Sequence, residues 1–290
     1  MAQLLPIIVA WCAFAAVVLR SPTAALLLAT VALATALPPG ARSQPFLHSR
    51  VWDCWRRRFR YSGVVPPVPF CAPGVPHVFA HFPHAVFPMG SFLSFPLCGD
   101  PATGVPAPME GLCATVLLRV PFYKHVFAWL GCHPADKPRM MAHLAAGRSV
   151  GVIVEGVAGI FHGATPSAER VYLSNRKGFV KAALQAGAPL VPVYHLGASQ
   201  LLSFSGVADA SRAVRASLGV YWGARGVPLP RRHDIISLVG RPIVVPRVDA
   251  PTQEEVDSLH ARFCAELVAL FDLHKHLLGP EWEAKTLKVV

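Results

Sequence analysis

The chain has 290 residues, of which 53% are hydrophobic and 15% are charged, and its formal net charge is +11. Soluble domains usually carry roughly 25% charged residues, so this composition is atypical of a soluble protein and predicts that part of the chain lies in lipid. The positive charge suits an anionic membrane surface, a nucleic acid or a polyanionic ligand such as coenzyme A, and charge alone does not choose among them. The length allows one sizeable domain and a membrane anchor.

The first 38 residues are expected to form a membrane hairpin. Apolar runs at 4–19 and 23–37 are separated by a short break that contains Arg20, the only charged residue before Arg42. Each run is shorter than the roughly 20 residues of a full span, so the hairpin either crosses a thin bilayer or dips into it re-entrantly. A cleaved secretory signal is the alternative, but it would carry its basic residues before the apolar stretch.

Residues 39–74 are interpreted as an interfacial linker, first basic and aromatic and then proline-rich. The basic and aromatic residues are Arg42, Arg50, Arg56, Arg57, Arg58, Arg60, Trp52, Trp55, Phe59 and Tyr61. This mixture is typical of a membrane interface and places the following chain on the cytosolic side. A solvated charge run is the plainer alternative, and no nucleic-acid partner is expected because no recognition motif is found.

Residues 75–290 predict one α/β domain. Strands are expected at 75–80, 149–155 and 189–195, and helices at 140–146 and 177–186, which end at Gly147 and Gly187. Alternation of strand and helix favours parallel pairing of the strands. Thr252 and Glu255 form a capping box before a long helix, whose apolar stripe we expect to pack on the core.

His84 is the leading candidate for a catalytic base. It follows a predicted strand in Phe82-Pro83-His84-Ala85, and α/β proteins place active sites at the carboxyl ends of strands. An imidazole there could take a proton from an alcohol near neutral pH. A histidine chosen on position alone is more often an ordinary packed or surface residue.

A metal site is not expected beside it. His77 and His81 lie close in sequence, but Pro76 and Pro83 break any helix that would gather three histidines on one face. The seven cysteines are scattered without a C-x-x-C pair, and we interpret them as free thiols in a reducing compartment.

Glu155-Gly156 places a carboxylate at the end of a second predicted strand. If the two strand ends converge, the carboxylate would hold the His84 imidazole in one tautomer and stabilise its cationic form. The alternative is an ordinary surface glutamate.

Arg176, Lys177 and Gly178 come at the start of a predicted helix. Free N–H groups and the helix dipole favour phosphate at such a position, and a phosphate of coenzyme A would suit it. The alternative is that the two cations only face solvent. The sequence motifs of several other enzyme classes are absent: we find no G-x-S-x-G, P-loop, H-E-x-x-H or dinucleotide glycine pattern.

Three blocks of sequence resemble the type-2 diacylglycerol acyltransferase family, which includes monoacylglycerol and wax-alcohol acyltransferases. They are HVFAHFPHAVFPMGSF at 77–92, NRKGFVKAALQAGAPLVPVYHLG at 175–197 and GRPIVVPRVDAPTQEEVD at 240–257. The resemblance implies a glycerolipid-acyltransferase-like α/β domain with an N-terminal transmembrane or re-entrant hairpin. It also implies transfer of an acyl group from acyl-CoA to the free hydroxyl of diacylglycerol, which yields triacylglycerol.

The chain departs from the family pattern at the candidate site. The first histidine of the usual His-Pro-His-Gly is Phe82 and the glycine is Ala85, whereas His84 is retained. Many relatives carry Gly-Gly-x-x-Glu where this chain has its acid at Glu155 and a glycine, Gly159, in the usual acidic place. In the wider glycerolipid acyltransferases an aspartate follows the histidine by five residues, and that position is Met89.

The resemblance completes the expectations about the site. The expected catalytic residues are His84 and Glu155, and the expected substrate-binding residues are Phe82, Pro83, Gly156, Arg176, Lys177 and Gly178. No metal or cofactor is expected, because acyl-CoA is a substrate. The expected partners are acyl-CoA, diacylglycerol and membrane lipids, in the endoplasmic reticulum membrane with a cytosolic domain or at lipid droplets. A homo-oligomer is left open, as are a monoacylglycerol, fatty alcohol or lysophospholipid acceptor and a catalytically silent lipid-droplet scaffold.

Overall fold

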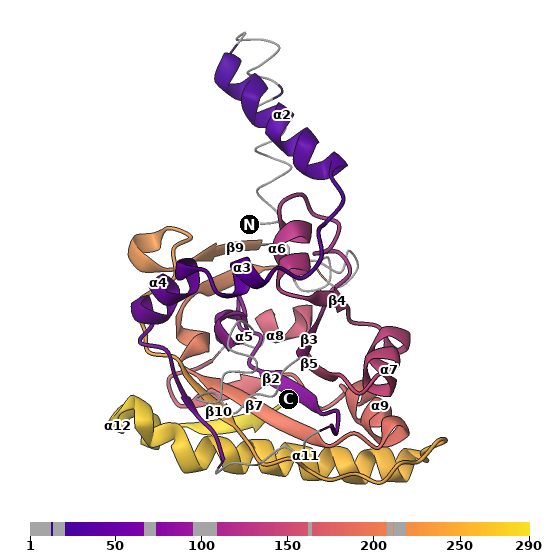
Figure 1. Cartoon of the computed structure of the whole chain (residues 1–290). Helices are drawn as coiled ribbons and strands as arrows, with labels where there is room; N and C mark the ends of the chain where they lie inside the picture. Colours follow the sequence, from indigo (N-terminus) through magenta and orange to yellow (C-terminus); the bar gives the residue numbers. More distant parts are fainter. Residues whose placement is uncertain are drawn as a thin grey trace.

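A seven-stranded sheet forms the centre of the fold, in the order β1-β10-β7-β2-β5-β3-β4 (Figure 1). The computed structural model describes residues 13, 21–66, 74–94, 109–161, 164–207, 211 and 219–290. The strands are β1 (Ser62–Val64), β2 (Val78–Phe82), β3 (Met109–Cys113), β4 (Cys132–Pro134), β5 (Ser149–Ile153), β7 (Leu190–Leu196) and β10 (Ile236–Val239). Neighbours pair in parallel except β10, which is antiparallel to β7. The predicted α/β fold with parallel pairing is confirmed.

One face of the sheet is covered by three helices, α7 (Lys137–Ala145), α9 (Gly178–Ala186) and α11 (Gln253–His274). The other face carries α3 (Gln44–Leu47), α4 (Arg50–Arg58), α5 (Met89–Ser94) and α6 (Tyr123–Trp129). Strand side chains alternate between these layers. Phe82 and Tyr194 therefore face the core under α11, whereas Phe79 packs on the opposite side.

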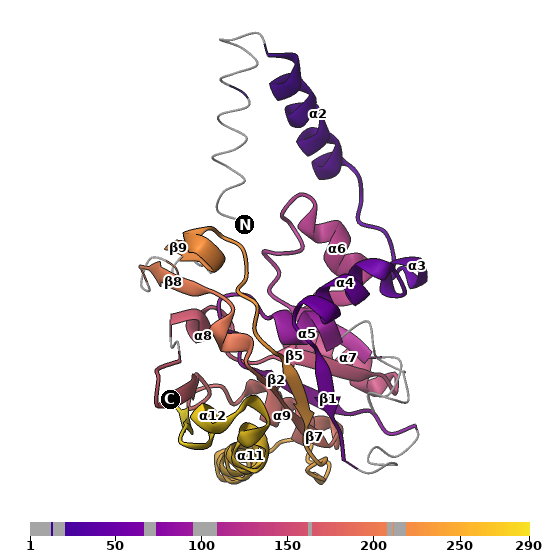
Figure 2. The same cartoon turned by 90° about the vertical axis from the view of Figure 1, so that its left-hand side faces the viewer.

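Two smaller sheets flank the large one. Strand β6 (Ala168–Val171) pairs in parallel with β11 (Thr286–Val289), and β8 (Ser203–Gly206) pairs antiparallel with β9 (Gly219–Trp222). Short helices α8 (Val157–Phe161) and α12 (Pro280–Glu283) and 3₁₀ turns at Ala198–Gln200, Ala224–Gly226 and Lys275–Leu278 complete the described elements. Figure 2 shows α11 and α12 at the base of the molecule and β8 and β9 near its upper side.

The predicted ends of two helices are confirmed. The Thr252 hydroxyl accepts the N–H of Glu255, and the Glu255 carboxylate accepts the N–H of Thr252, so the predicted capping box is present. The apolar stripe of α11 packs on the core as expected. Gly187 ends α9 with a φ of 64°, a left-handed conformation that glycine adopts without steric cost.

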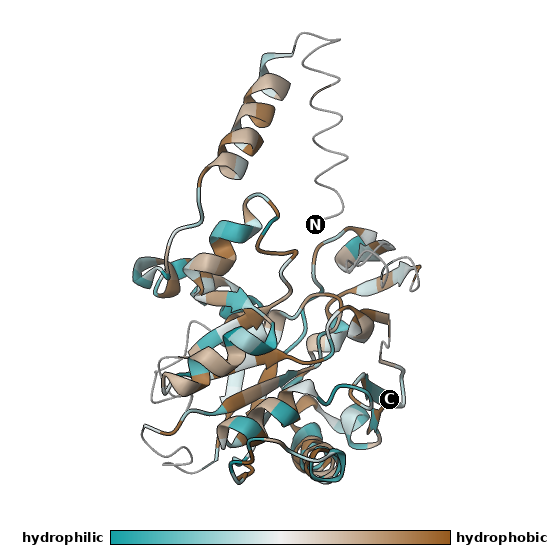
Figure 3. Cartoon of the chain, turned by 90° about the vertical axis from the view of Figure 1, so that its right-hand side faces the viewer, coloured by the Kyte–Doolittle hydropathy of each residue, from teal (hydrophilic) through white to brown (hydrophobic). Residues whose placement is uncertain are grey.

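The predicted hairpin is described only in its second arm, α2 (Pro22–Ala36), while the first arm lies outside the described residues apart from Ala13. Figure 3 shows α2 as a largely apolar helix that projects from the domain. Its carboxyl end is held by α6, because Lys124 Nζ donates to the carbonyl of Leu37 at 2.7 Å. Among the described residues, no helix is long and apolar enough to cross a membrane. The membrane hairpin therefore stays a prediction.

Part of the expected interfacial linker belongs structurally to the α/β domain. Trp52 and Phe59 of the α4 region are buried in the core layer above the sheet. Strand β1 then pairs with β10 as the edge of the large sheet. The basic aromatic segment is therefore a packed helix and strand, because its aromatic side chains find an apolar surface on the domain itself.

Candidate active site

The ends of strands β2 and β5 converge, as the sequence predicted. The strands pair in parallel with His81 opposite Ile153, so His84 and Glu155 follow at the same edge of the sheet. Glu155 Oε2 accepts a hydrogen bond from the backbone N–H of His84 at 2.5 Å. The carboxylate therefore fixes the main chain that carries His84 and does not contact its ring.

A different group sets the tautomer of His84. Nδ1 lies 2.9 Å from the carbonyl oxygen of Ala85, and because a carbonyl only accepts, Nδ1 carries the proton. Nε2 is then the acceptor nitrogen. Burial lowers the pKa of His84 below its usual value, with the Ala85 hydrogen bond as a smaller opposing effect. The imidazole is therefore neutral at pH 7 and able to accept a proton.

Glu155 is fully buried. Its other oxygen, Oε1, accepts the backbone N–H of Tyr172 at 2.8 Å, so one carboxylate joins the loops after β5, β2 and β6. Burial raises the pKa of Glu155 to about 7, although the hydrogen bonds from Tyr172 and His84 and the charge of Arg176 lower it. Glu155 thus acts as a positioning residue held between two backbone donors.

The shift of the acid relative to the family pattern has a steric explanation. Gly159 packs directly on Glu155: a Cβ at position 159 would lie 2.7 Å from Glu155 Cβ and 2.9 Å from Oε1. The glutamate at 155 therefore fills the space beside position 159 and requires glycine there. Gly156 has a φ of 59° with nothing within 4 Å of a Cβ, so its requirement is conformational.

The predicted phosphate-binding residues separate into two environments. The Arg176 guanidinium lies 5.2 Å from the centre of the Tyr172 ring, beside Glu155. Lys177 Nζ is 2.7 Å from Asp257 Oδ1 of α11. Gly178 begins α9 and is exposed. Arg176 therefore lies at the Tyr172 loop that Glu155 also binds, whereas Lys177 has an anionic partner.

The side chains of Phe82 and Pro83 are buried. Phe82 has no exposed surface and packs against Phe263 of α11, with ring centres 6.1 Å apart. We had expected Phe82 to bind substrate. Its side chain packs in the core instead, because its position on the strand faces the α11 layer. Pro83 sets the backbone between this core residue and His84.

The neighbouring histidines do not join His84. His77 is buried, and its Nδ1 lies 2.8 Å from the Val75 carbonyl. His81 Nδ1 lies 3.0 Å from His195 Nε2, which is also 3.3 Å from Ser91 Oγ. His77 and His81 are each 2% exposed, so both rings are packed inside the domain. The described residues contain no group of three or more His, Cys, Asp or Glu suited to a metal ion.

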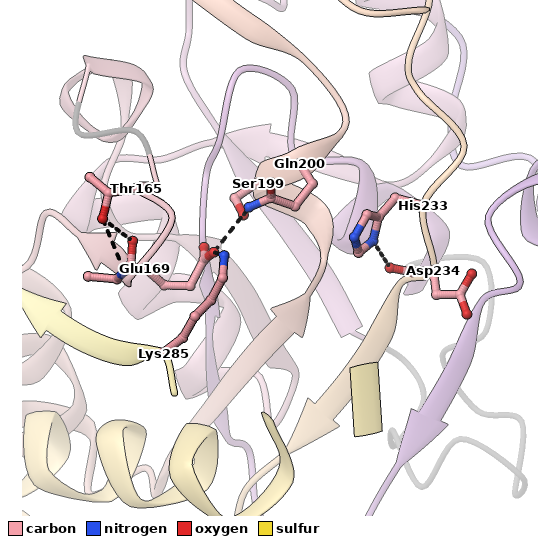
Figure 4. Close-up of polar contacts among 8 residues, drawn as sticks. Thr165, Glu169, Ser199, Gln200, His233, Asp234 and Lys285 are labelled. Atoms are coloured by element: carbon pink, nitrogen blue, oxygen red, sulfur yellow. Dashed lines mark hydrogen bonds and ion pairs between the residues drawn. The ribbon is translucent and has the colours of Figure 1, made fainter. Parts of the chain in front are cut away.

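Sequence reasoning missed the support of the Tyr172 loop. Strand β11 pairs with β6, and the carbonyl of Val290 accepts the N–H groups of Leu173 and Ser174 at 2.9 and 3.1 Å. Below this loop, Lys285 Nζ forms a buried ion pair with Glu169 Oε1 at 3.0 Å, and Gln200 Nε2 donates to the same oxygen at 3.2 Å (Figure 4). These partners are over 30 residues apart, so no local pattern could reveal them.

Comparison with known proteins decides the family. Residues 72–288 match the diacylglycerol acyltransferase family. The chain belongs to this family. It is 31% identical over 232 residues to diacylglycerol O-acyltransferase 2 of Bos taurus, a match that covers 71% of this chain and 63% of that protein. It is 27% identical over 266 residues to the protein of the same name from Danio rerio, covering 83% and 73%.

A distant likeness to a solved structure accompanies these relatives. The crystal structure of the 1-acyl-sn-glycerophosphate acyltransferase PlsC from Thermotoga maritima aligns with a TM-score of 0.43 and 14% identity, covering 91% of this chain and 97% of that one. Membership of the diacylglycerol acyltransferase family itself rests on the sequence match, which includes His84, Glu155 and Arg176.

Proposed function

We propose that the chain transfers an acyl group from acyl-CoA to the free hydroxyl of diacylglycerol, with His84 as general base. The observation that carries the proposal is the orientation of His84: the Ala85 carbonyl accepts from Nδ1, which makes Nε2 the proton-accepting nitrogen, and Glu155 holds the backbone. Membership of the diacylglycerol acyltransferase family supports the reaction class. The matched region covers 63% of the bovine relative, so the activity of the whole relative is a proposal for this chain.

The chemistry requires one base and no covalent acyl-enzyme. Nε2 takes the proton of the diacylglycerol hydroxyl as its oxygen attacks the thioester carbonyl. When the tetrahedral intermediate collapses, the carbon–sulfur bond breaks and the thiolate takes the proton from the imidazolium. The products are triacylglycerol and free coenzyme A, and His84 returns to its neutral form. The proposed reaction steps use no metal or cofactor.

Arg176 and the exposed start of α9 at Gly178 are proposed to contact a phosphate of acyl-CoA. The support is the position of the Arg176 guanidinium beside Glu155, where it would bring an anionic donor to the base. Lys177 contributes less because it is paired with Asp257. Gly156 and Pro83 shape the two loops that carry Glu155 and His84.

We further propose that the enzyme acts at the endoplasmic reticulum membrane with its α/β domain in the cytosol, and at lipid droplets. The apolar helix α2 and the basic helix α4, which follows it in the chain, support contact with membrane lipids. The alternative acceptors, a monoacylglycerol, a fatty alcohol or a lysophospholipid, would need the same base.

The decisive experiment is expression in a cell that lacks its own triacylglycerol synthesis. The unchanged chain should restore triacylglycerol, and His84→Ala should lower microsomal turnover by about a hundredfold to ten-thousandfold at equal abundance. His48→Ala is the matched control, because His48 is exposed and lies after the short helix α3. Full turnover by His84→Ala would overturn the mechanism, and activity only on other supplied acceptors would overturn the choice of diacylglycerol.

A further inference from the structure

A concave and strongly basic region lies outside the residues of the candidate active site. Two adjoining cavities, of about 710 and 780 Å³, share Arg58 and Arg232 in their walls. Together they are lined by Arg57, Arg58, Arg60, Arg225, Arg231 and Arg232, and we call this region the arginine cleft. Its volumes lie in the range of roughly 300–1,000 Å³ that is usual for ligand pockets.

Segments far apart in sequence build the cleft. The end of α4 supplies Arg57 and Arg58, and Arg60 follows it. The chain before β10 supplies the other three arginines, and α12 closes one side through Glu281. Figure 1 shows α4 and α12 on the same flank of the molecule, with β10 between them in height. His233 and Asp234, also in the wall, lie beyond Gln200 from the buried Glu169–Lys285 pair (Figure 4).

One wall of the cleft comes from chain at the sheet edge that carries the candidate active site. Ile236, the first residue of β10, lies opposite Leu196 at the end of β7. Phe82, at the end of β2, lies opposite Tyr194 of the same strand. The chain that enters β10 with Arg231 and Arg232 is therefore on the same edge as His84, on the β10 side.

Positive charge in the cleft is only partly balanced. The carboxylates in its walls are Asp234 and Glu281, against six guanidinium groups. Asp234 pairs with Arg60 at 2.6 Å. Within the described residues, Arg225 and Arg232 have no hydrogen-bond or ion-pair partner, and the buried Nε of Arg58 has no hydrogen-bond acceptor.

Hydrogen bonds within the domain explain the positions of two of these arginines, but not why six arginines gather in one cleft. Arg58 donates to the Pro230 carbonyl at 2.7 Å, and Arg231 donates to Ser203 Oγ at 2.9 Å. Those two guanidinium groups are thereby oriented in the wall. Bringing several like charges into one concavity is unfavourable unless an anion binds there. Arginine recognises phosphate through paired N–H donors, which makes phosphate the anion that this wall fits.

The second cavity adds an apolar side, because Val227 and Leu229 line it and are 50% and 44% exposed. We propose that the arginine cleft binds the phosphate group of an amphiphilic ligand, supplied by coenzyme A or by an anionic phospholipid. Coenzyme A carries phosphate at two places, so this site and Arg176 are compatible. The proposal does not depend on acyl transfer, because binding is measured without turnover.

The test uses the full chain in phosphatidylcholine nanodiscs and isothermal titration calorimetry. One arm titrates free coenzyme A, and the other titrates dihexanoyl phosphatidic acid, with dihexanoyl phosphatidylcholine as the zwitterionic reference. The variant is Arg57→Gln with Arg232→Gln, both exposed in the cleft. The matched control is Arg139→Gln with Arg262→Gln, which removes the same charge from exposed positions on α7 and α11.

The cleft variant should raise the dissociation constant of at least one probe by about tenfold or more, while the control changes it by less than about twofold. Weaker binding of coenzyme A alone assigns the site to the acyl donor, and weaker binding of phosphatidic acid alone assigns it to a lipid headgroup. Unchanged binding of both probes, or equal loss in the control, overturns the proposal. Arg225→Asn provides an independent variant if the first unfolds, since Arg225 is at a φ of 55° that asparagine tolerates.

Discussion

Glu155 binds His84 through the backbone: its Oε2 accepts the His84 N–H while Oε1 accepts the N–H of Tyr172. The carboxylate therefore couples two loops and leaves the imidazole to be oriented by Ala85. This arrangement differs from a triad, in which the acid contacts the ring nitrogen of the base. It assigns Glu155 the positioning of the main chain, and the predictions below separate that role from proton transfer.

Replacing Glu155 by glutamine should lower kcat by about tenfold or more with a smaller change in KM. The amide nitrogen would face one of the two backbone donors, so one buried hydrogen bond of about 1–3 kcal/mol is lost. Initial rates and the thermal unfolding midpoint in detergent measure the two effects. Glu110→Gln is the control, a buried carboxylate held by His133, Arg148 and Arg42, and it should cost stability without changing kcat. Unchanged kcat in Glu155→Gln would remove the positioning role.

Adding one methyl group at Gly159 should displace Glu155. The new Cβ would lie 2.7 Å from Glu155 Cβ, so Gly159→Ala is expected to destabilise the fold by about 1–3 kcal/mol and to reduce turnover. The same change at Gly63 places its Cβ 3.7 Å from the Ser237 carbonyl oxygen and should be tolerated. If both alanine variants were equally active and stable, the prediction that a Cβ at position 159 displaces Glu155 would be wrong.

Arg176 and Lys177 should behave differently although they are adjacent. Arg176→Ala should raise the KM for acyl-CoA by about tenfold or more, because a charge-assisted phosphate contact is lost. Lys177→Ala removes a solvent-screened surface ion pair with Asp257 and should change stability and KM little. Steady-state kinetics with acyl-CoA and diacylglycerol varied in turn measure this. Equal increases in KM for both substrates would indicate damage to the fold.

The protein should lose stability as the pH falls below about 6.5. Burial lowers the pKa of His81 from 6.5 to about 3, and burial beside His81 lowers the pKa of His195 well below 6.5. The unfolded chain therefore binds more protons below pH 6.5, and each histidine reduces the free energy of unfolding by about 1.4 kcal/mol per pH unit until its folded pKa is reached. The pKa of Glu155 is raised from 4.5 to about 7, so between those values this carboxyl makes the folded state more stable as the pH falls. It contributes one proton, whereas His81 and His195 contribute one each in the opposite direction.

Thermal unfolding midpoints between pH 7 and pH 5 measure this dependence. His81→Gln should make the dependence shallower, because it removes one of the buried rings whose pKa is lowered. His48→Gln at an exposed position should leave the dependence unchanged. A midpoint that rises on acidification in the unchanged protein would contradict the assignment of neutral, buried histidines.

Local signals in the sequence determined the elements of this protein and one candidate residue. The helix end at Gly187 and the capping box at Thr252 were predictable, because glycine and the Thr–Glu pair act within a few residues of themselves. His84 was identifiable from its position after a buried strand. The strand ending there was predicted at residues 75–80, about two residues too early, since strand boundaries depend on the neighbouring strands that supply the hydrogen bonds.

Only the tertiary structure decided what each candidate contacts. Glu155 was expected at the His84 ring and lies at its backbone. Lys177 was expected at a phosphate and pairs with Asp257, 80 residues away. His81 is buried and its ring contacts His195 of the neighbouring strand β7, a contact between residues 114 positions apart. Each of these contacts joins residues that are far apart in the sequence and that meet only when the layers pack. Local sequence patterns do not predict such contacts.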